Sequence, residues 1–168
     1  IRFSDQKTNS RYKKSKKNRK YSKMILIKSG VFVMGSDTGP KISAPAFKVP
    51  LKAFYIDRSE VSNQEYAAFV KKYNHRFPPS WPRGLIPAGQ ADRPVVKVNW
   101  NDARRYCRAV GKRLPKEAEW EKAFRGENGN KYPWSGNTIY PRDARTVESG
   151  GLAPDSVTSV SKDVSLYG

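Results

Sequence analysis

One continuous stretch, residues 93–134, constrains the fold most, because helix-forming patterns and helix-ending residues follow one another closely in it. It reads RPVVKVNWNDARRYCRAVGKRLPKEAEWEKAFRGENGNKYPW and holds three of the four tryptophans and the only cysteine. The β-branched residues Val95, Val96 and Val98 near its start predict a short buried strand, since such side chains pack well on a pleated surface. A strand, two helices and an aromatic loop therefore form the frame on which the rest of the chain is placed.

The first helix predicted in this stretch follows a polar capping residue. Asn99 or Asn101 can fill that role, because a short polar side chain accepts a hydrogen bond from the free amides of the first helical turn. Gly111 is expected to end the helix, since glycine reaches the left-handed conformation at low cost. One face should pack on the core, given the spacing of its apolar residues, Ala103, Tyr106, Cys107 and Val110.

The second helix is predicted to restart at Pro115, because the first helical position needs no amide hydrogen. Its charges match the helix dipole, with acidic residues near the positive end and basic residues near the negative end. Gly126 is expected to close it. The charged residues in question are Glu117, Glu119, Lys122 and Arg125.

Charge and composition divide the 168-residue chain into a basic arm and one domain. Half of the net charge of +18 lies in residues 1–23, which hold ten basic residues and one acidic residue. Strong self-repulsion and little apolar content predict that this arm is extended, and disordered unless bound. Residues 24–168 are predicted to form the domain, and no apolar run approaches the about 18 residues of a membrane span.

The arm has two open interpretations: a solvated leader, or a segment that docks on an acidic partner. Protein, an anionic membrane surface and nucleic acid are the candidate partners, and nucleic acid is disfavoured because no recognised nucleic-acid-binding motif accompanies the charge. The residues expected to contact a partner are basic residues of the arm and one aromatic residue of a later loop, namely Arg11, Lys13, Lys14, Lys16, Lys17, Arg19, Lys20 and Trp81.

Shorter patterns predict the elements before residue 93. Residues 24–34, MILIKSGVFVM, predict a hairpin that turns at Lys28-Ser29-Gly30, and residues 49–56 predict another strand. Ser62 with Glu65 three positions later forms the capping box that opens a helix. That helix should pack by one face, given the spacing of Tyr66, Phe69, Val70 and Tyr73.

The loop of residues 74–93 contains four prolines and is long enough for a functional role to be considered. It holds His75, the only histidine, which has no partner ligands at metal-binding spacing and is predicted to be a surface residue. Trp81 is predicted to anchor the loop, with a platform for a ligand as the alternative.

Three segments carry a resemblance to a known family. MILIKSGVFVMGSD (24–37), LKAFYIDRSEVSNQEYAAFV (51–70) and the stretch 93–134 resemble, in order and spacing, the formylglycine-generating enzyme family, also called the sulfatase-modifying factor family. The resemblance covers about residues 24–167. The residues expected to carry the structural motif are Trp100, Asp102, Cys107, Arg113, Leu114, Pro115, Glu117, Glu119, Trp120 and Trp134.

This resemblance implies a loop-rich, C-type-lectin-like α+β fold with two to three short helices and short antiparallel strands, incomplete at its C-terminus. Aromatic anchors would pin its loops, and Trp100, Trp120, Tyr132 and Trp134 are the expected anchors. The family's best-known activity is copper-dependent oxidation of a target cysteine to formylglycine by O₂. Related members include sulfoxide synthases with nonheme iron and others that act as binding modules.

The implied metal sites are the weak part of the match. The resemblance places the copper-binding cysteine pair beyond the residues in hand; copper(I) needs soft thiolates there, and Cys107, the only cysteine, is expected to be a small buried hydrophobe. Of the family's calcium ligands, one falls at Ala144-Arg145, where a guanidinium replaces an oxygen, and another near Thr158. We therefore predict no catalytic residue and no cofactor in this chain, with copper or calcium only if a further C-terminal segment exists.

Two functions follow from these expectations. The first is a non-catalytic domain that acts as a binding or structural subunit of a larger bacterial envelope assembly, in the periplasm or at the cell surface. Its partners would be other protein subunits, acidic or supplying the missing strands. The alternative is the N-terminal portion of a formylglycine-generating or related oxidase, with copper or nonheme iron, and a weaker alternative is nucleic-acid binding through the arm.

Overall fold

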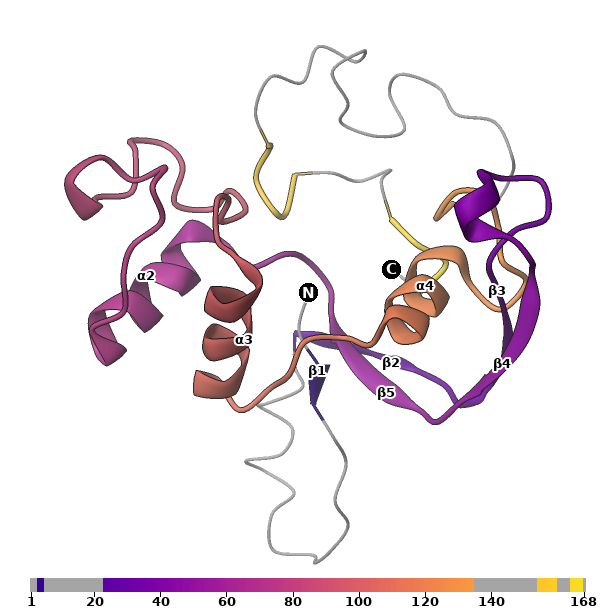
Figure 1. Cartoon of the computed structure of the whole chain (residues 1–168). Coiled ribbons are helices and arrows are strands. Elements are labelled where there is room, and N and C mark those ends of the chain that lie inside the picture. The colour runs from indigo at the N-terminus through magenta and orange to yellow at the C-terminus, as the bar shows by residue number, and fades with distance from the viewer. Residues whose placement is uncertain (1–2, 5–22, 135–153, 160–163, 168) are drawn as a thin grey trace, which may run out of the picture.

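The structure, a computed structural model, describes residues 3–4, 23–134, 154–159 and 164–167 and has a mixed α+β architecture (Figure 1). The predicted arm residues 11–20 and the predicted calcium position at 144–145 lie outside these ranges. In chain order the elements are β1 (Phe3–Ser4), β2 (Met24–Ile27), β3 (Gly30–Met34), the 3₁₀ turn η2 (Lys41–Ser43), β4 (Phe47–Leu51), β5 (Phe54–Asp57), α2 (Asn63–Tyr73), the 3₁₀ turn η3 (Pro82–Gly84), α3 (Trp100–Ala109) and α4 (Glu117–Arg125).

The strands form two small antiparallel sheets, and this corrects the predicted hairpin. The first sheet has the order β1-β5-β2 and the second pairs β3 with β4, so β2 and β3 are consecutive in the chain yet belong to different sheets. Ile25 lies opposite Ile56, and Phe32 lies opposite Val49. The single strand expected at 49–56 is likewise wrong, because the chain changes sheets between β4 and β5.

Local capping places the first two helices as predicted. The Ser62 hydroxyl accepts from the Glu65 amide at 3.3 Å, and a Glu65 carboxylate oxygen accepts from the Ser62 amide at 3.1 Å. Asn99, the first of the two proposed caps, makes the same reciprocal pair with Asp102 at the start of α3. Two orphan amides of each helix are satisfied in this way.

Two predictions around α3 and α4 are wrong. No strand forms over residues 95–98: the chain makes one isolated bridge between Ser62 and Pro94, and Lys97 adopts a left-handed φ of 58°. Pro115 does not open α4, since the helix begins at Glu117 with Lys116 as its N-cap. The Lys116 side chain cannot accept a hydrogen bond from the first helical amides, so only half of a capping box forms. In that half the Glu119 carboxylate accepts from the Lys116 amide at 2.8 Å.

Two hydrophobic cores organise the described residues into a helical lobe and a sheet lobe. Figure 1 shows α2 and α3 at one end and α4 with strands β2 to β5 at the other. The helical core is built on Tyr66, Phe69, Trp81, Tyr106 and Cys107, and the sheet core on Ile27, Phe54 and Ala123.

A buried ion pair joins the two lobes. Lys112, after α3, lies 2.6 Å from the Asp57 carboxylate at the end of β5, and their side chains are only 11% and 6% exposed. Among the helices that the structure describes, none has the length and apolarity needed to cross a membrane.

Candidate functional site

Helix α4 is fixed to the sheet lobe by a buried lysine. Lys122 is completely inaccessible, and its ammonium group donates to the carbonyls of Lys28 at 3.0 Å and Gly30 at 3.3 Å. Because a buried charge is stable only when it is hydrogen-bonded, these two carbonyls fix the turn around Lys122. This turn sends β2 and β3 into different sheets.

The start of α4 is held by the family motif itself. Arg113 makes a two-pronged ion pair with Glu119, with both N–O distances at 2.7 Å. Burial alone raises the pKa of Glu119, but the hydrogen bonds from Arg113 and the Lys116 amide outweigh burial and the pKa is lowered. Arg113 and Glu119 are thus saturated by each other and hold the helix in place.

The end of α4 is tied to two loops. Glu121 accepts from the Gly35 amide at 2.7 Å and pairs with Arg125 one turn later. Arg125 also donates to the carbonyls of Gly35 at 2.8 Å and Gly129 at 2.7 Å. The loops after β3 and after α4 are thereby positioned on either side of one helix.

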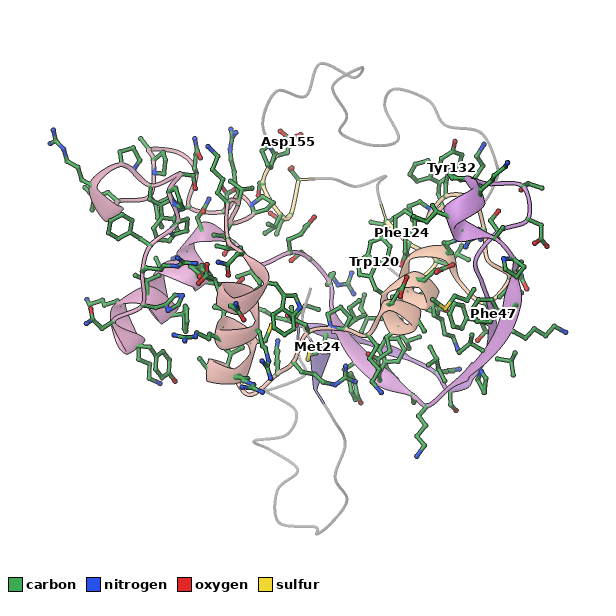
Figure 2. All side chains as sticks on the ribbon, viewed as in Figure 1. Met24, Phe47, Trp120, Phe124, Tyr132 and Asp155 are labelled. Carbon is green, nitrogen blue, oxygen red and sulfur yellow. The ribbon has the colours of Figure 1, made fainter. Side chains whose placement is uncertain are left out.

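The opposite face of α4 carries a stacked aromatic pair, of which Trp120 is exposed and Phe124 is half-buried. Trp120 and Phe124 lie one turn apart and stack with ring centroids 5.1 Å apart and planes inclined by 9° (Figure 2). Trp120 is 41% exposed. Both rings line two neighbouring cavities, a groove of about 1260 Å³ and a smaller hollow of about 280 Å³.

The far wall of the larger groove is the segment from Met34 to Phe47. Ile42 in η2 is 95% exposed and Phe47 at the start of β4 is 51% exposed, so this wall presents two exposed apolar side chains among polar ones. The smaller hollow is closed by Tyr167, against the sheet core. We call the surface formed by Ile42, Phe47, Trp120 and Phe124 the α4 groove.

Sequence reasoning missed this groove, although a signal for it was present. Trp120 and Phe124 are spaced i, i+4 and therefore share a stripe, as Glu119, Lys122 and Ala123 share the buried one. An aromatic stripe beside a buried stripe that holds Ala123 predicts that the aromatic stripe meets something other than the helix's own core. Trp120 was instead expected to be a buried loop anchor, and its exposure corrects that expectation.

Of the other aromatic residues predicted to anchor loops, some are buried and some are exposed. Trp81 is 3% exposed, and its indole N–H donates to Asn63 at 2.9 Å, so it anchors the 74–93 loop as predicted. The prediction that Trp81 contacts a partner is wrong, because that role needs a side chain on the surface. Trp100 is 62% exposed beside Arg104, which contradicts its role as an anchor. Tyr132 and Trp134 stack on each other at 5.2 Å.

The prediction that His75 is a surface residue is wrong. Its side chain is only 11% exposed, and its Nε2 lies 3.1 Å from the Asp102 carboxylate. The guanidinium of Arg76 binds the same carboxylate. The sequence separates His75 from Asp102 by 27 positions, so no local spacing reveals the contact. Hydrogen bonding by Arg76 holds the pKa of Asp102 below its usual range, with the Asn99 amide and His75 adding to the effect.

The implied copper site does not fit the described residues. Cys107 forms no disulfide and is 2% exposed in the helical core, as predicted for a small buried hydrophobe. A search of the described part of the chain finds no group of three or more His, Cys, Asp or Glu side chains that could hold a metal ion. A two-thiolate copper site cannot be built from the single cysteine of this sequence.

Comparisons with known proteins agree with this architecture. Residues 8–161 match the family model of the sulfatase-modifying factor enzyme 1-like domain. The formylglycine-generating enzyme of Bos taurus is 36% identical over 72% of this chain and 44% of its own length. The formylglycine-generating enzyme of Streptomyces coelicolor is 33% identical over 70% of this chain and 51% of its own.

Two further matches bear on the fold and on activity. The inactive Cα-formylglycine-generating enzyme 2 of Bos taurus is 33% identical over 70% of this chain and 54% of its own length. The solved structure of PvdO from Pseudomonas aeruginosa superimposes with a TM-score of 0.66 at 23% identity, over 84% of this chain and 65% of that one. At that identity the superposition shows the fold alone.

The fold and the family match together define a sulfatase-modifying-factor-type α+β domain. This chain belongs to the sulfatase-modifying factor enzyme 1-like family, and the predicted fold class is confirmed. The chain spans about half the length of the curated formylglycine-generating enzymes it matches. The family model begins at residue 8, inside the segment that we predicted to precede the domain.

Proposed function

We propose that this chain works as a non-catalytic binding domain of its family, whose α4 groove docks a complementary polypeptide. The observation that carries the proposal is the stack of the exposed Trp120 on the half-buried Phe124, which lines a groove of about 1260 Å³. Exposed apolar side chains that gather at one groove typically mark an interaction site. Aromatic anchors such as tryptophan contribute much of the free energy at protein interfaces.

The proposed occupant of the α4 groove is the complementary half of a sulfatase-modifying-factor-type domain. A segment of that half would pack apolar side chains against Trp120 and Phe124. The curated relatives are about twice as long as the region this chain matches, and we propose that the rest of such a domain packs on this face. The buried face of α4 is already occupied by the sheet core through Ala123 and Lys122, which leaves the Trp120 face for the partner.

The absence of catalysis in this proposal rests on how the acidic and thiol groups of the described residues are used. Asp102 and Glu119 each bind an arginine through two hydrogen bonds, and both have lowered pKa values. A general base is most effective with a pKa near the working pH, so these carboxylates suit structure better than proton transfer. The thiol of Cys107 is enclosed in the helical core.

Two further parts of the proposal concern place and partner chemistry. The basic segment that holds Arg11 to Lys20 is proposed to contact an acidic surface of the same assembly, since a concentrated positive charge steers association with anionic partners. A bacterial periplasmic or cell-surface location is proposed from the family resemblance.

The docking proposal is tested by Trp120→Glu, with Leu85→Glu as the matched control. Leu85 is 69% exposed in the helical lobe, away from the groove, so both variants place one charge on an exposed apolar side chain. The tagged chain is expressed in its native host and its assembly is sized by sedimentation. Loss of a central aromatic anchor should weaken docking by at least about 2 kcal/mol, so the Trp120 variant should sediment as a smaller species and the Leu85 variant should not.

Oxidation of tryptophan by N-bromosuccinimide gives an independent readout. Trp120 should react readily in the isolated chain and be protected in the native assembly. Equal reactivity in both states, or an unchanged assembly with the Trp120 variant, would contradict the proposal. Concentration-dependent dimers of the isolated chain that Trp120→Glu abolishes would also contradict it, because the occupant would then be a second copy.

The non-catalytic part has its own test. The chain is incubated with copper, O₂, a thiol reductant that supplies the two further electrons needed to reduce O₂ to water, and a cysteine-containing sulfatase peptide, and conversion of cysteine to formylglycine is followed by mass spectrometry. No turnover is expected above a reaction without protein. Robust conversion by this chain alone would refute the non-catalytic assignment and leave the docking test intact.

One observation favours a second candidate. The 36% identity to a formylglycine-generating enzyme of which the chain spans 44% is also what the N-terminal portion of such an oxidase, with copper or nonheme iron, would show. The intact mass of the native protein separates the two. A mass near 19.1 kDa favours the separate binding subunit, and a much larger mass with a paired-cysteine segment favours the oxidase.

A further inference from the structure

The net charge of the domain is concentrated in its helical lobe. Residues 61–116, which contain α2 and α3, hold twelve basic and three acidic residues, a net charge of +9. The rest of the domain, residues 24–60 and 117–168, has no net charge. A second concentration of positive charge, equal to that of the basic arm, thus lies in a folded part of the chain.

Much of this charge lies on the outward face of α3. Tyr106 and Cys107 bury the inward face of the helix in the helical core. The carboxylate of α3, Asp102, is also buried, and Arg76 donates to both of its oxygens. Within the part of the chain that the structure describes, none of the outward arginines has an ion-pair partner. The outward side chains are all exposed, namely Trp100, Asn101, Arg104, Arg105 and Arg108.

Three of these side chains form one stripe. Trp100, Arg104 and Arg108 are spaced four residues apart, so they lie on the same side of the helix. The guanidinium carbon of Arg104 lies 5.1 Å from the centroid of the Trp100 ring, which is a cation–π contact, and Trp100 is still 62% exposed. The contact orders the guanidinium before any partner arrives, which reduces the entropy lost when its N–H groups bind an acceptor. We call the surface formed by Trp100, Arg104 and Arg108 the α3 stripe.

A polar hollow lies beside the α3 stripe. Asn101 and Arg105, the sequence neighbours of Trp100 and Arg104, line this hollow of about 570 Å³ together with Asn74. The hollow gives room for a polar side chain of a partner. An exposed aromatic anchor with polar groups around it is the usual arrangement of a protein interface.

The composition of the α3 stripe fits a polypeptide better than a lipid surface or a nucleic acid. Arginine and tryptophan are enriched at protein interfaces and lysine is depleted, and all exposed charges of α3 are arginines. A helix that lies on a membrane needs an apolar face for the lipid, and the apolar face of α3 is buried in the helical core. Single-stranded nucleic acid stacks successive bases on several aromatic rings, and the outward face of α3 presents Trp100 alone.

We infer that the α3 stripe binds an acidic polypeptide segment. Its carboxylates pair with Arg104 and Arg108, whose planar guanidinium groups match a carboxylate through two parallel hydrogen bonds, and an apolar side chain of the segment covers Trp100. A second copy of this chain is a poor occupant, because it brings the same net charge of +18. The α3 stripe and the α4 groove belong to different lobes (Figure 1), so the inference does not depend on the docking proposed for α4.

The test is a titration of the full chain, followed by the indole N–H resonance of Trp100 and the backbone amide of Arg105. The probe is a capped peptide of five Glu-Leu-Ala-Ala repeats, in which glutamate recurs every four residues as the arginines do. Three probes compete with it: the same peptide with glutamine in place of glutamate, a thymidylate hexamer with the same five negative charges, and vesicles of phosphatidylglycerol.

The key variant combines Arg104→Gln with Arg108→Gln. The matched control combines Lys71→Gln with Lys72→Gln, which removes two exposed positive charges from α2 in the same lobe. Lys72 also lies over an exposed aromatic ring, that of Tyr73, at 5.2 Å, so the control reproduces the cation–π contact as well. All four positions are exposed, and the melting temperatures of both double variants should equal that of the wild type.

The glutamate peptide is expected to bind saturably and to shift both resonances. The α3 double variant should weaken binding by about tenfold or more, because two ion pairs are lost, and the α2 double variant by less than about threefold. Trp100→Ala, followed by the Arg105 amide, should weaken binding by about fivefold or more, because an aromatic anchor is lost. Leu85→Ala, at another exposed apolar side chain of the helical lobe, should leave it unchanged.

Five results would overturn the inference. Absence of saturable shifts means that the outward face of α3 is merely solvated, and equal losses in the two double variants mean a general attraction to a basic lobe. Binding of the glutamine peptide as tight as that of the glutamate peptide removes the recognition of carboxylates. Binding of the hexamer or the vesicles at least as tight as that of the glutamate peptide assigns the surface to phosphate groups. Self-association of the isolated chain that the α3 double variant abolishes makes the occupant a second copy. Each of these results leaves the Trp120→Glu test of the α4 groove intact, because that test measures the native assembly.

Discussion

Replacing Lys122 with methionine is expected to lower the free energy of unfolding by about 3 kcal/mol. Methionine keeps most of the apolar stem, so the change removes mainly the ammonium donors to the carbonyls of Lys28 and Gly30. A hydrogen bond that involves a charged group contributes about 1.5–3 kcal/mol, and the 3.3 Å bond to Gly30 counts toward the low end. Glu127, at 3.7 Å and 57% exposed, adds little because exposed pairs are screened.

The measurement is equilibrium unfolding in urea, followed by far-ultraviolet circular dichroism. With a slope of about 2 kcal/mol/M, a loss of about 3 kcal/mol moves the midpoint down by about 1.5 M. Lys52→Met is the control, since Lys52 is exposed in the link between β4 and β5. A midpoint for Lys122→Met within about 0.3 M of the wild type would refute the reasoning. Removing the ammonium group that binds both carbonyls would then not measurably change the free energy of unfolding.

Two further predictions concern the helical lobe and the loop beside α4. Because hydrogen bonding by Arg76 lowers the folded-state pKa of Asp102, its stabilisation is complete above the unfolded value of about 3.9 and is lost as the pH falls through the lowered folded value. The melting temperature of Asp102→Asn should therefore be lower than that of wild type at pH 6, and the difference should shrink toward pH 2; a constant difference would contradict this. Gly35→Ala should lower the free energy of unfolding by about 3 kcal/mol, since φ is +81° and the added Cβ would lie 2.6 Å from the Pro45 carbonyl oxygen. Gly89→Ala is the control, with φ +69° and no atom within 4 Å of the added Cβ, and should lower it by only about 1 kcal/mol. Thermal unfolding of the two glycine variants separates close approach from backbone conformation, and equal losses would show that the approach to Pro45 is unimportant.

Features that depend on neighbours in sequence were predictable here. The capping box at Ser62 forms as the sequence predicts, and Asn99, one of the two caps predicted for α3, caps that helix. The burial of Cys107 follows from the helical spacing of its apolar neighbours. The capping interactions are complete inside one turn of helix, and the spacing along one helix shows which face is buried, so neither needs knowledge of the rest of the fold.

Features that depend on distant partners were not predictable. The segment 24–34 has the pattern of a hairpin, but Lys122, some 92 residues later, draws the carbonyl of Gly30 away from that pairing. His75 looks isolated in its loop, yet Asp102 lies 27 positions on and accepts its hydrogen bond. The run of valines before α3 has strand propensity, but the left-handed Lys97 interrupts it. Propensity was overridden by tertiary contacts at each of these sites.

The family-motif residues of this chain hold its elements together. Glu119 is held by Arg113, Asp102 by Arg76, and Cys107 by the helical core, so these described motif residues have their bonding capacity used inside the domain. Groups in that state hold elements in place, and a family likeness carried by them transfers the fold more securely than the chemistry. The α4 groove is lined by side chains outside those contacts, among them Trp120 and Phe124. Function in this domain should therefore be sought where α4 and α3 present exposed side chains outside those contacts.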